Sequence, residues 1–182
     1  MSQGPALAEA VAALRRGGVV LHATEGVWGL ACDPTLPAAV QRVFELKQRP
    51  GDRGLILIGG DASAFEPELK VLPAEVRTRV LSSWPGPNSW VLPTSRFSDR
   101  VTGGRETVAA RVPGHDQARD LASAFGGPLV STSANLSGKP AATSMSAADA
   151  LGLAVDYRLP GEVLRPGVPS TLRLLSGEIL RG

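Results

Sequence analysis

Two short polar clusters contain the residue types that bind anionic ligands. In the first, Lys47 and Arg49 end a predicted helix over residues 37–47. Lys47 continues the apolar stripe of this helix, together with Val40 and Phe44, so its ammonium should point into a cleft bordered by the core. Cations at the end of a helix also complement the helix dipole, and this simpler interpretation stays open.

The second cluster is the run 131–139, which carries four hydroxyl side chains and the amide of Asn135. It continues an apolar strand predicted over residues 129–132, so its polar groups should emerge at a strand end. Ligands of open α/β sheets favour such ends. The same composition is also typical of a turn whose side chains only cap backbone groups, and both interpretations remain.

Single residues elsewhere add weaker signals. Arg111 lies among apolar residues of a predicted strand and needs a partner, which is either a buried carboxylate or an anionic ligand. Thr24 ends the first predicted strand, and Ser170 precedes the last ones, where ordinary turn chemistry explains it equally well. Trp84 and Trp90 are interpreted as packing residues.

The familiar catalytic and nucleotide-binding motifs are absent from the sequence. It has no glycine-rich phosphate loop, no G-x-S-x-G elbow around a nucleophile and no H-E-x-x-H pair. Bound phosphates must therefore be held by side chains and irregular backbone. A hydrolase or transferase with Ser133 as nucleophile is disfavoured, because the sequence position of neither His22 nor His115 identifies it as the general base for this serine. His22 is interpreted instead as a hydrogen-bonded strand residue.

The elements that must position these residues alternate between strands and helices, which predicts an α/β fold with a mixed sheet. Helices are predicted over residues 5–16, 37–47, 73–84 and 115–125, with a short one opened by a capping box at Ser146–Asp149. Strands are predicted over residues 19–23, 55–58, 89–92, 107–112 and 129–132, with a terminal hairpin over 171–175 and 178–180. Residues 24–29 are predicted to turn the chain.

Composition limits the remaining possibilities. With 182 residues, 43% hydrophobic and 20% charged, the chain is predicted to form one domain over residues 1–182. The net charge of +2 is weak evidence for a polyanionic partner. One cysteine excludes an intramolecular disulfide, and two histidines cannot alone form a zinc site. Without a signal segment or a long apolar run, a cytoplasmic location with no membrane association is predicted.

The motifs occur in an order that resembles the YrdC/TsaC family. The hallmarks of that family, K-x-R and S-x-N, stand here as Lys47-Gln48-Arg49 and Ser133-Ala134-Asn135. Their context matches along almost the whole chain, in the segments Ala23–Gly29, Glu45–Pro50, Trp84–Pro87, Ala110–Pro113, Pro128–Gly138 and Pro169–Thr171. The length is similar to the short, single-domain branch of the family.

The resemblance implies a twisted mixed sheet flanked by helices, with a concave, positively charged cavity. It also implies a threonylcarbamoyl-AMP synthase, which condenses L-threonine, bicarbonate (or CO2) and ATP to threonylcarbamoyl-adenylate and pyrophosphate. The product would pass to the tRNA threonylcarbamoyl-transfer machinery, for the adenosine next to the anticodon in tRNAs that read ANN codons. Mg2+ is expected with ATP, without a dedicated protein site.

The resemblance also assigns roles to residues. Lys47 and Arg49 would be catalytic. The ATP-binding residues would be Lys47, Arg49, Arg53, Thr107, Ser133 and Asn135, and the threonine-binding residues Thr24, Arg111, Ser131 and Ser170. The chain departs from longer relatives at Gly26, where they carry a threonine, and at Ile58, which replaces a threonine-contacting histidine.

The alternative is a maturation factor that binds double-stranded RNA or tRNA in the same basic cavity. The enzyme is preferred, because the sequence contains one compact polar constellation and few aromatic residues for stacking bases (4%). Direct RNA binding remains an additional partner to test.

Overall fold

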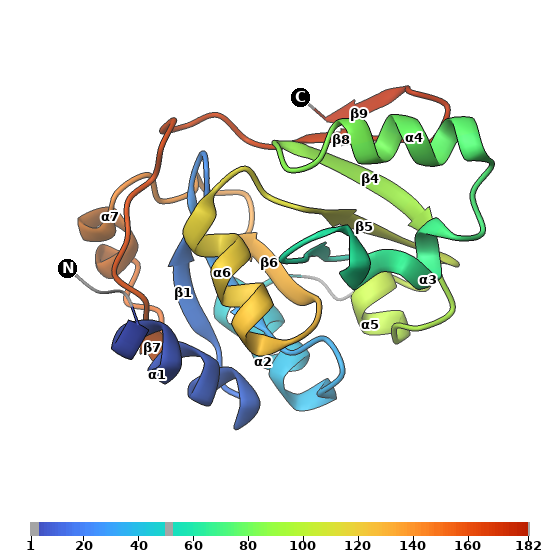
Figure 1. The fold of residues 1–182 in the computed structure, drawn as a ribbon. Helices are drawn as coiled ribbons and strands as arrows, with labels where there is room; N and C mark the ends of the chain where they lie inside the picture. The colour runs from blue at the N-terminus through green and yellow to red at the C-terminus, as the bar shows by residue number, and fades with distance from the viewer. Residues whose placement is uncertain (1–3, 50–52, 182) are drawn as a thin grey trace.

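The computed structural model describes residues 4–49 and 53–181, which fold around one twisted mixed β-sheet (Figure 1). Within the described residues the sheet has nine strands, in the order β7-β1-β2-β6-β3-β5-β4-β8-β9. The strands are β1 (Val20–Ala23), β2 (Trp28–Cys32), β3 (Ile56–Ile58), β4 (Asn88–Pro93), β5 (Thr107–Arg111), β6 (Leu129–Ser133), β7 (Tyr157–Arg158), β8 (Thr171–Arg173) and β9 (Ile179–Arg181). The order shows that several neighbouring strands, such as β7 and β1 or β2 and β6, come from distant parts of the chain.

The sheet contains both parallel and antiparallel strand pairs. The pairs β1/β7, β3/β5 and β4/β8 are parallel, whereas β1/β2, β2/β6, β3/β6, β4/β5 and β8/β9 are antiparallel. The predicted terminal hairpin is therefore confirmed as β8 and β9. The expected mixed sheet is confirmed as well.

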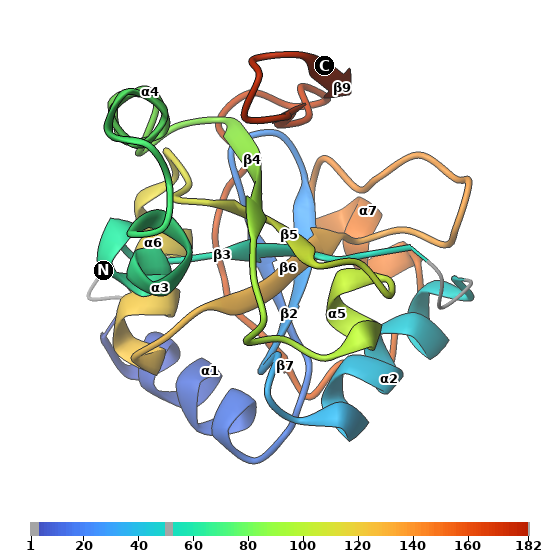
Figure 2. The same ribbon diagram turned by 90° about the vertical axis from the view of Figure 1, so that its right-hand side faces the viewer.

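Helices cover both faces of the sheet (Figure 2). On one face, α1 (Gly4–Arg15) packs against α6 (Asp116–Phe125), and on the other α2 (Pro37–Lys47) packs against β2 and α5 (Asp99–Thr102). The shorter elements are η1 (Ala62–Phe65), α3 (Glu66–Leu69), α4 (Ala74–Ser82) and α7 (Met145–Ala150). None of the helices in the described parts of the chain is long and apolar enough to cross a membrane.

Each face of the sheet has its own apolar cluster, as strand alternation requires. Leu57 belongs to the cluster under α2, and its neighbour Ile58 belongs to the cluster under α1 and α6. Both side chains are fully buried, which confirms that this strand is covered on both faces. Trp84 and Trp90 are also buried, as the sequence indicated.

Two local predictions were wrong. The turn predicted over residues 24–29 is shorter, because β2 begins at Trp28. A strand was missed there, since its residues are buried throughout and show no alternation of polar and apolar side chains. The short helix α7 is capped by Ser144, whose hydroxyl accepts from the Ala147 amide, and not by the predicted box starting at Ser146.

A strap formed by residues 160–170 returns across the turn between β1 and β2. The Arg165 amide donates to the Glu25 carbonyl (2.6 Å), and the Gly167 amide donates to the Gly26 carbonyl (2.9 Å). A Cβ on Gly26 would lie 1.7 Å from the Val168 carbonyl oxygen, closer than any side chain tolerates. Gly26 is therefore explained by the close approach of the strap.

We predict that Gly26→Ala displaces the strap and destabilises the protein by about 1–3 kcal/mol, the usual cost of forcing atoms into a packed site. The measurement is the free energy of unfolding in urea. Gly127→Ala is the matched control, because a Cβ there meets nothing within 4 Å. Equal stability of the two variants would contradict the packing that the strap imposes on Gly26.

Candidate active site

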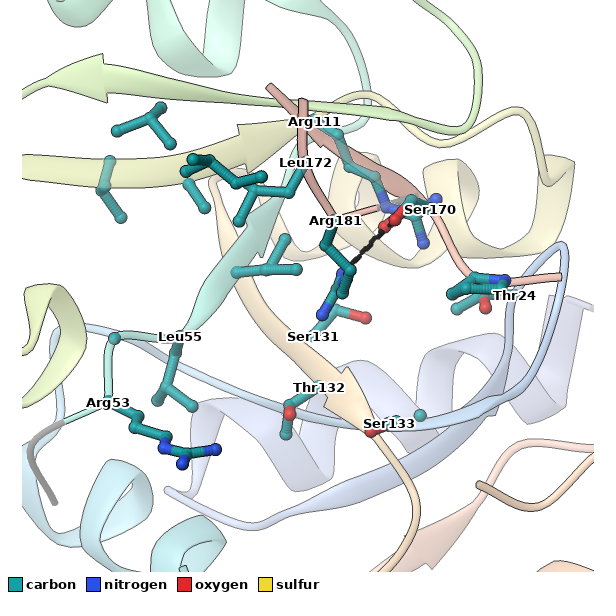
Figure 3. Close-up of a pocket in the computed structure, with 18 of the residues that line it drawn as sticks. Thr24, Arg53, Leu55, Arg111, Ser131, Thr132, Ser133, Ser170, Leu172 and Arg181 are labelled. Atoms are coloured by element: carbon teal, nitrogen blue, oxygen red, sulfur yellow. Dashed lines mark hydrogen bonds between the residues drawn. The ribbon is translucent and has the colours of Figure 1, made fainter. Parts of the chain in front are cut away.

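A cavity of about 700 Å³ is lined by residues along β5 and β6, by the turn after β1 and by the end of the strap (Figure 3). Such a volume suits a small-molecule ligand. Most of the predicted site residues line it, namely Thr24, Arg49, Arg53, Thr107, Arg111, Ser131, Ser133 and Ser170. Lys47 and Asn135 are not among the lining residues, although both contact Ser133. Pro50, which follows the K-x-R motif, lies outside the described residues.

Arginines dominate the charged groups of the cavity. Arg49, Arg53, Arg105, Arg111 and Arg181 line it, and Glu25 is the acidic lining residue within the described ranges 4–49 and 53–181. In the same ranges no aromatic side chain lines the cavity, and no cluster of three His, Cys, Asp or Glu could hold a metal ion. The walls therefore combine cations with aliphatic surface.

Arg111 is paired with Glu25, a residue that sequence reasoning missed. The Nη1 atom of Arg111 donates to both carboxylate oxygens of Glu25 (3.1 and 3.0 Å). The Gly114 amide donates to the same carboxylate (2.6 Å). Burial lowers the pKa of the Arg111 guanidinium, and the charge of Glu25 opposes this shift. Because the ion pair uses Nη1 alone, Nη2 and Nε of Arg111 lie outside it.

Lys47 joins the end of α2 to the end of β6. Its ammonium donates to the carbonyl of Ser133, the carbonyl of Asn135 (3.2 Å) and the amide oxygen of Asn135 (2.6 Å). The Ser133 hydroxyl donates to the same amide oxygen (2.8 Å). Burial, and secondarily the charge of Arg49, lowers the pKa of Lys47 to about 8. The buried lysine therefore orders the S-x-N segment, and the sequence correctly predicted that it lies on the inner face of the helix.

Arg49 and Arg53 lie at the end of the cavity opposite Arg111. Arg49 donates through Nη2 to the Gly54 carbonyl (2.9 Å) and through Nη1 to the Thr132 hydroxyl (3.5 Å). Arg53 extends towards the cavity from the segment before β3 (Figure 3). The hydroxyl residues at the end of β6 lie between the two cationic ends (Figure 3).

The other end of the cavity is completed by the C-terminal hairpin. Arg181 of β9 approaches Ser170, with its Nη2 atom 3.4 Å from the Ser170 carbonyl and 3.5 Å from its hydroxyl (Figure 3). The Ser89 hydroxyl also donates to the Ser170 hydroxyl (3.3 Å). Sequence reasoning missed Arg181, and the only signal for it was a charged residue directly after the predicted strand 178–180.

Two further predicted positions have clear structural settings. The Thr24 hydroxyl donates to the Val27 carbonyl (2.7 Å), so it also shapes the turn after β1. Ile58 is fully buried and does not line the cavity. The residue at position 58 therefore belongs to the core in this chain.

Fold and cavity together define a class of protein: an α/β protein whose mixed sheet borders a cavity lined by arginines and hydroxyl side chains, in a sequence without a glycine-rich phosphate loop. Comparison with known proteins narrows this class. The profile of the Sua5/YciO/YrdC family, described as "Telomere recombination", matches residues 12–182. The chain belongs to this family.

Two sequence relatives and one solved structure show what members of this family are. The chain is 50% identical over 180 residues to the threonylcarbamoyl-AMP synthase of Chromohalobacter salexigens, covering 96% of each chain. It is 43% identical over 186 residues to that of Xanthomonas campestris pv. campestris, covering 100% of each. It also matches the crystal structure of P. abyssi Sua5 complexed with L-threonine (34% identity, TM-score 0.87), covering 97% of this chain and 52% of that one. The chain thus spans about half the length of that Sua5.

We predict that the affinity for an anionic probe whose own charge is constant over this range, inorganic sulfate, is constant below pH 8 and weakens above it. Lys47 is charged below its pKa of about 8 and loses its proton as the pH rises through that value, so the charge and one N–H donor disappear. The expected loss is at most about tenfold per pH unit. Isothermal titration from pH 7 to 9.5 measures it.

The matched control for this titration is Lys70→Met, which alters an exposed lysine outside the cavity and should keep the dependence. Lys47→Met should bind more weakly, with an affinity that no longer changes near pH 8. An unchanged profile in Lys47→Met would show that another group titrates.

Proposed function

We propose that this protein is an L-threonylcarbamoyladenylate synthase that forms threonylcarbamoyl-adenylate and pyrophosphate from L-threonine, bicarbonate (or CO2) and ATP. The observation that carries the proposal is a cavity with two cationic ends separated by hydroxyls, in a chain that matches named synthases over their full length. One end suits a polyphosphate and the other suits an amino-acid carboxylate. RNA binding is not favoured, since the described cavity lining lacks aromatic residues for stacking.

The reaction needs positioning and charge neutralisation more than covalent chemistry by the protein. The threonine amine adds to carbon dioxide and loses a proton, which gives a carbamate. A carbamate oxygen then bonds to the α-phosphorus of ATP, while the bond from that phosphorus to the oxygen bridging the β-phosphate breaks. Pyrophosphate leaves with the electron pair.

The phosphate end of the site is assigned to Arg49 and Arg53, with Ser133 at the end of β6 and Thr107 at the start of β5. Five arginines against one glutamate give the described cavity lining a net positive charge, which favours ATP and stabilises charge that develops in the transition state. Lys47 and Asn135 act from behind this surface. They hold the Ser133 segment in place, and Lys47 adds its charge to the same region.

The amino-acid end is assigned to Arg111, Ser131, Ser170 and Thr24. Nη2 and Nε of Arg111 bind the threonine carboxylate, because Glu25 already occupies Nη1. This pairing fixes the plane of the guanidinium, which suits it for a planar carboxylate. Arg181 reaches Ser170 in the same region and adds a second cation beside Arg111.

Mg2+ accompanies the nucleotide in this proposal. Glu25 is the carboxylate that the described cavity lining offers, and it is committed to Arg111. The ATP phosphates therefore provide most ligands of the ion, whose chemistry is neutralisation of phosphate charge. The product then passes to the tRNA threonylcarbamoyl-transfer machinery.

The direct test is mass spectrometry of the reaction products. We expect a threonylcarbamoyl-adenylate species, with pyrophosphate release only when threonine, bicarbonate and ATP are all present. Omitting each substrate in turn provides the controls. Pyrophosphate release without threonine, or absence of the adenylate species, would overturn the proposal.

Replacing Arg49 with Ala should lower kcat/KM by about 10²-fold or more, because a charge that stabilises the transition state is lost. Arg77→Ala is the control, since Arg77 forms an exposed ion pair with Glu66 outside the cavity. Pyrophosphate release measures both variants. Turnover at the wild-type rate in Arg49→Ala would remove Arg49 from the site.

A further inference from the structure

His22 is a buried histidine that the reaction described above does not use. It lies on β1, is fully buried, and its Nε2 atom is 3.2 Å from the hydroxyl of Ser131 on β6. Strands β1 and β6 are not neighbours, because β2 lies between them. The two side chains therefore reach across a whole strand to meet.

Gly29 on β2 makes this contact possible. It is the register partner of His22, and it carries no side chain that would fill the space above the strand. A Cβ at this position would lie 3.2 Å from His22 Nε2 and 3.5 Å from the Ser131 hydroxyl. The hydrogen bond between His22 and Ser131 thus passes over Gly29, where β2 has no side chain in the way.

The hydrogen-bond partners of the ring determine its tautomer. His22 Nδ1 lies 3.1 Å from the Ala23 carbonyl, which can only accept, so Nδ1 carries the proton. Nε2 then has a lone pair and accepts from the Ser131 hydroxyl. The ring stays neutral at ordinary pH, because burial above all, and then the charges of His115 and Arg111, lower its pKa to about 3. Such a weak base is unsuited to removing a proton from the substrate amine.

We propose that His22 is a positioning residue that holds the Ser131 hydroxyl proton away from the cavity, so that Ser131 presents only lone pairs to the substrate. This inference rests on the proposed function and deepens it. A serine hydroxyl otherwise rotates between donating and accepting. Fixed in this way, Ser131 accepts from the ammonium or hydroxyl group of the amino acid, while Arg111 in the same cavity donates to its carboxylate.

The two amide analogues of histidine separate positioning from packing. The side-chain amide of glutamine extends as far as Nε2 does, so His22→Gln can still accept from Ser131. The amide of asparagine reaches only as far as Nδ1, so His22→Asn keeps the bond to the Ala23 carbonyl and loses the one to Ser131. We expect the threonine KM to rise about 5- to 15-fold in His22→Asn, as for loss of one buried hydrogen bond, and less than about threefold in His22→Gln. The ATP KM should stay unchanged in both.

A double-mutant cycle tests whether His22 acts through Ser131. Ser131→Ala should raise the threonine KM, and adding His22→Asn to it should produce no further rise. Full additivity of the two changes, or a parallel rise of the threonine and ATP KM values in His22→Asn, would overturn the inference and indicate a purely structural role.

A spectroscopic measurement covers the case in which the variants fold poorly. Imidazole nitrogen NMR of the wild-type protein, which has only two histidines, should show a ring with a protonated Nδ1 and an unprotonated Nε2. A proton on Nε2 of His22 would overturn the inference. Calorimetry of threonine binding separates the proposed function from the role of His22. No binding to the wild type contradicts the proposed function. Equal binding to the wild type and to His22→Asn contradicts only the role of His22.

Discussion

The ammonium of Lys47 is the contact on which the cavity depends. Lys47, at the end of α2, is only 3% exposed. Its hydrogen bonds fix the chain that leaves β6 at Ser133 and Asn135. The Ser137 amide returns to the Lys47 carbonyl (2.8 Å), so the helix end and the S-x-N segment are held from both sides. A buried charge is tolerated only when it is bonded in this way. The Ser133 hydroxyl, which lines the cavity, owes its position to this arrangement.

A second buried cation shapes the opposite end. Arg111 at the end of β5 is neutralised by Glu25 from the turn after β1, and the Gly114 amide donates a further hydrogen bond to the Glu25 carboxylate. The pair offsets part of the cost of burying the two charges, and it also fixes the orientation of the guanidinium. The two ends of the cavity therefore differ. At one end Arg49 and Arg53 have no carboxylate among the described lining residues beside them, and at the other end Glu25 sets the direction of the Arg111 guanidinium.

The C-terminal part of the chain supplies one wall of the site. The strap over residues 160–170 crosses the turn that holds Glu25, and it is anchored at His115, whose Nε2 is 2.8 Å from the Glu162 carbonyl. The hairpin that follows brings Arg181 to Ser170.

The sequence by itself determined the types of residue and their local settings. The apolar stripe of the helix over residues 37–47 predicted that Lys47 is buried, and the apolar strand around Arg111 predicted a carboxylate or an anion as its partner. The same reasoning predicted most strands within one or two residues, because periodicity and turn residues act over short distances. It missed β2, whose residues are all buried and whose pattern lacks alternation.

Only the tertiary structure decided which of these residues meet. Glu25 reaches Arg111, His22 reaches Ser131, and Arg181 reaches Ser170, across sequence separations of 86, 109 and 11 residues. Each encounter depends on the strand order, in which β1, β2 and β6 lie side by side and the last strands add to β4. That order follows from pairing between distant strands, and the pattern of any one segment does not specify its distant partner. The sequence therefore specified the chemical groups, and the sheet decided how they combine into one site.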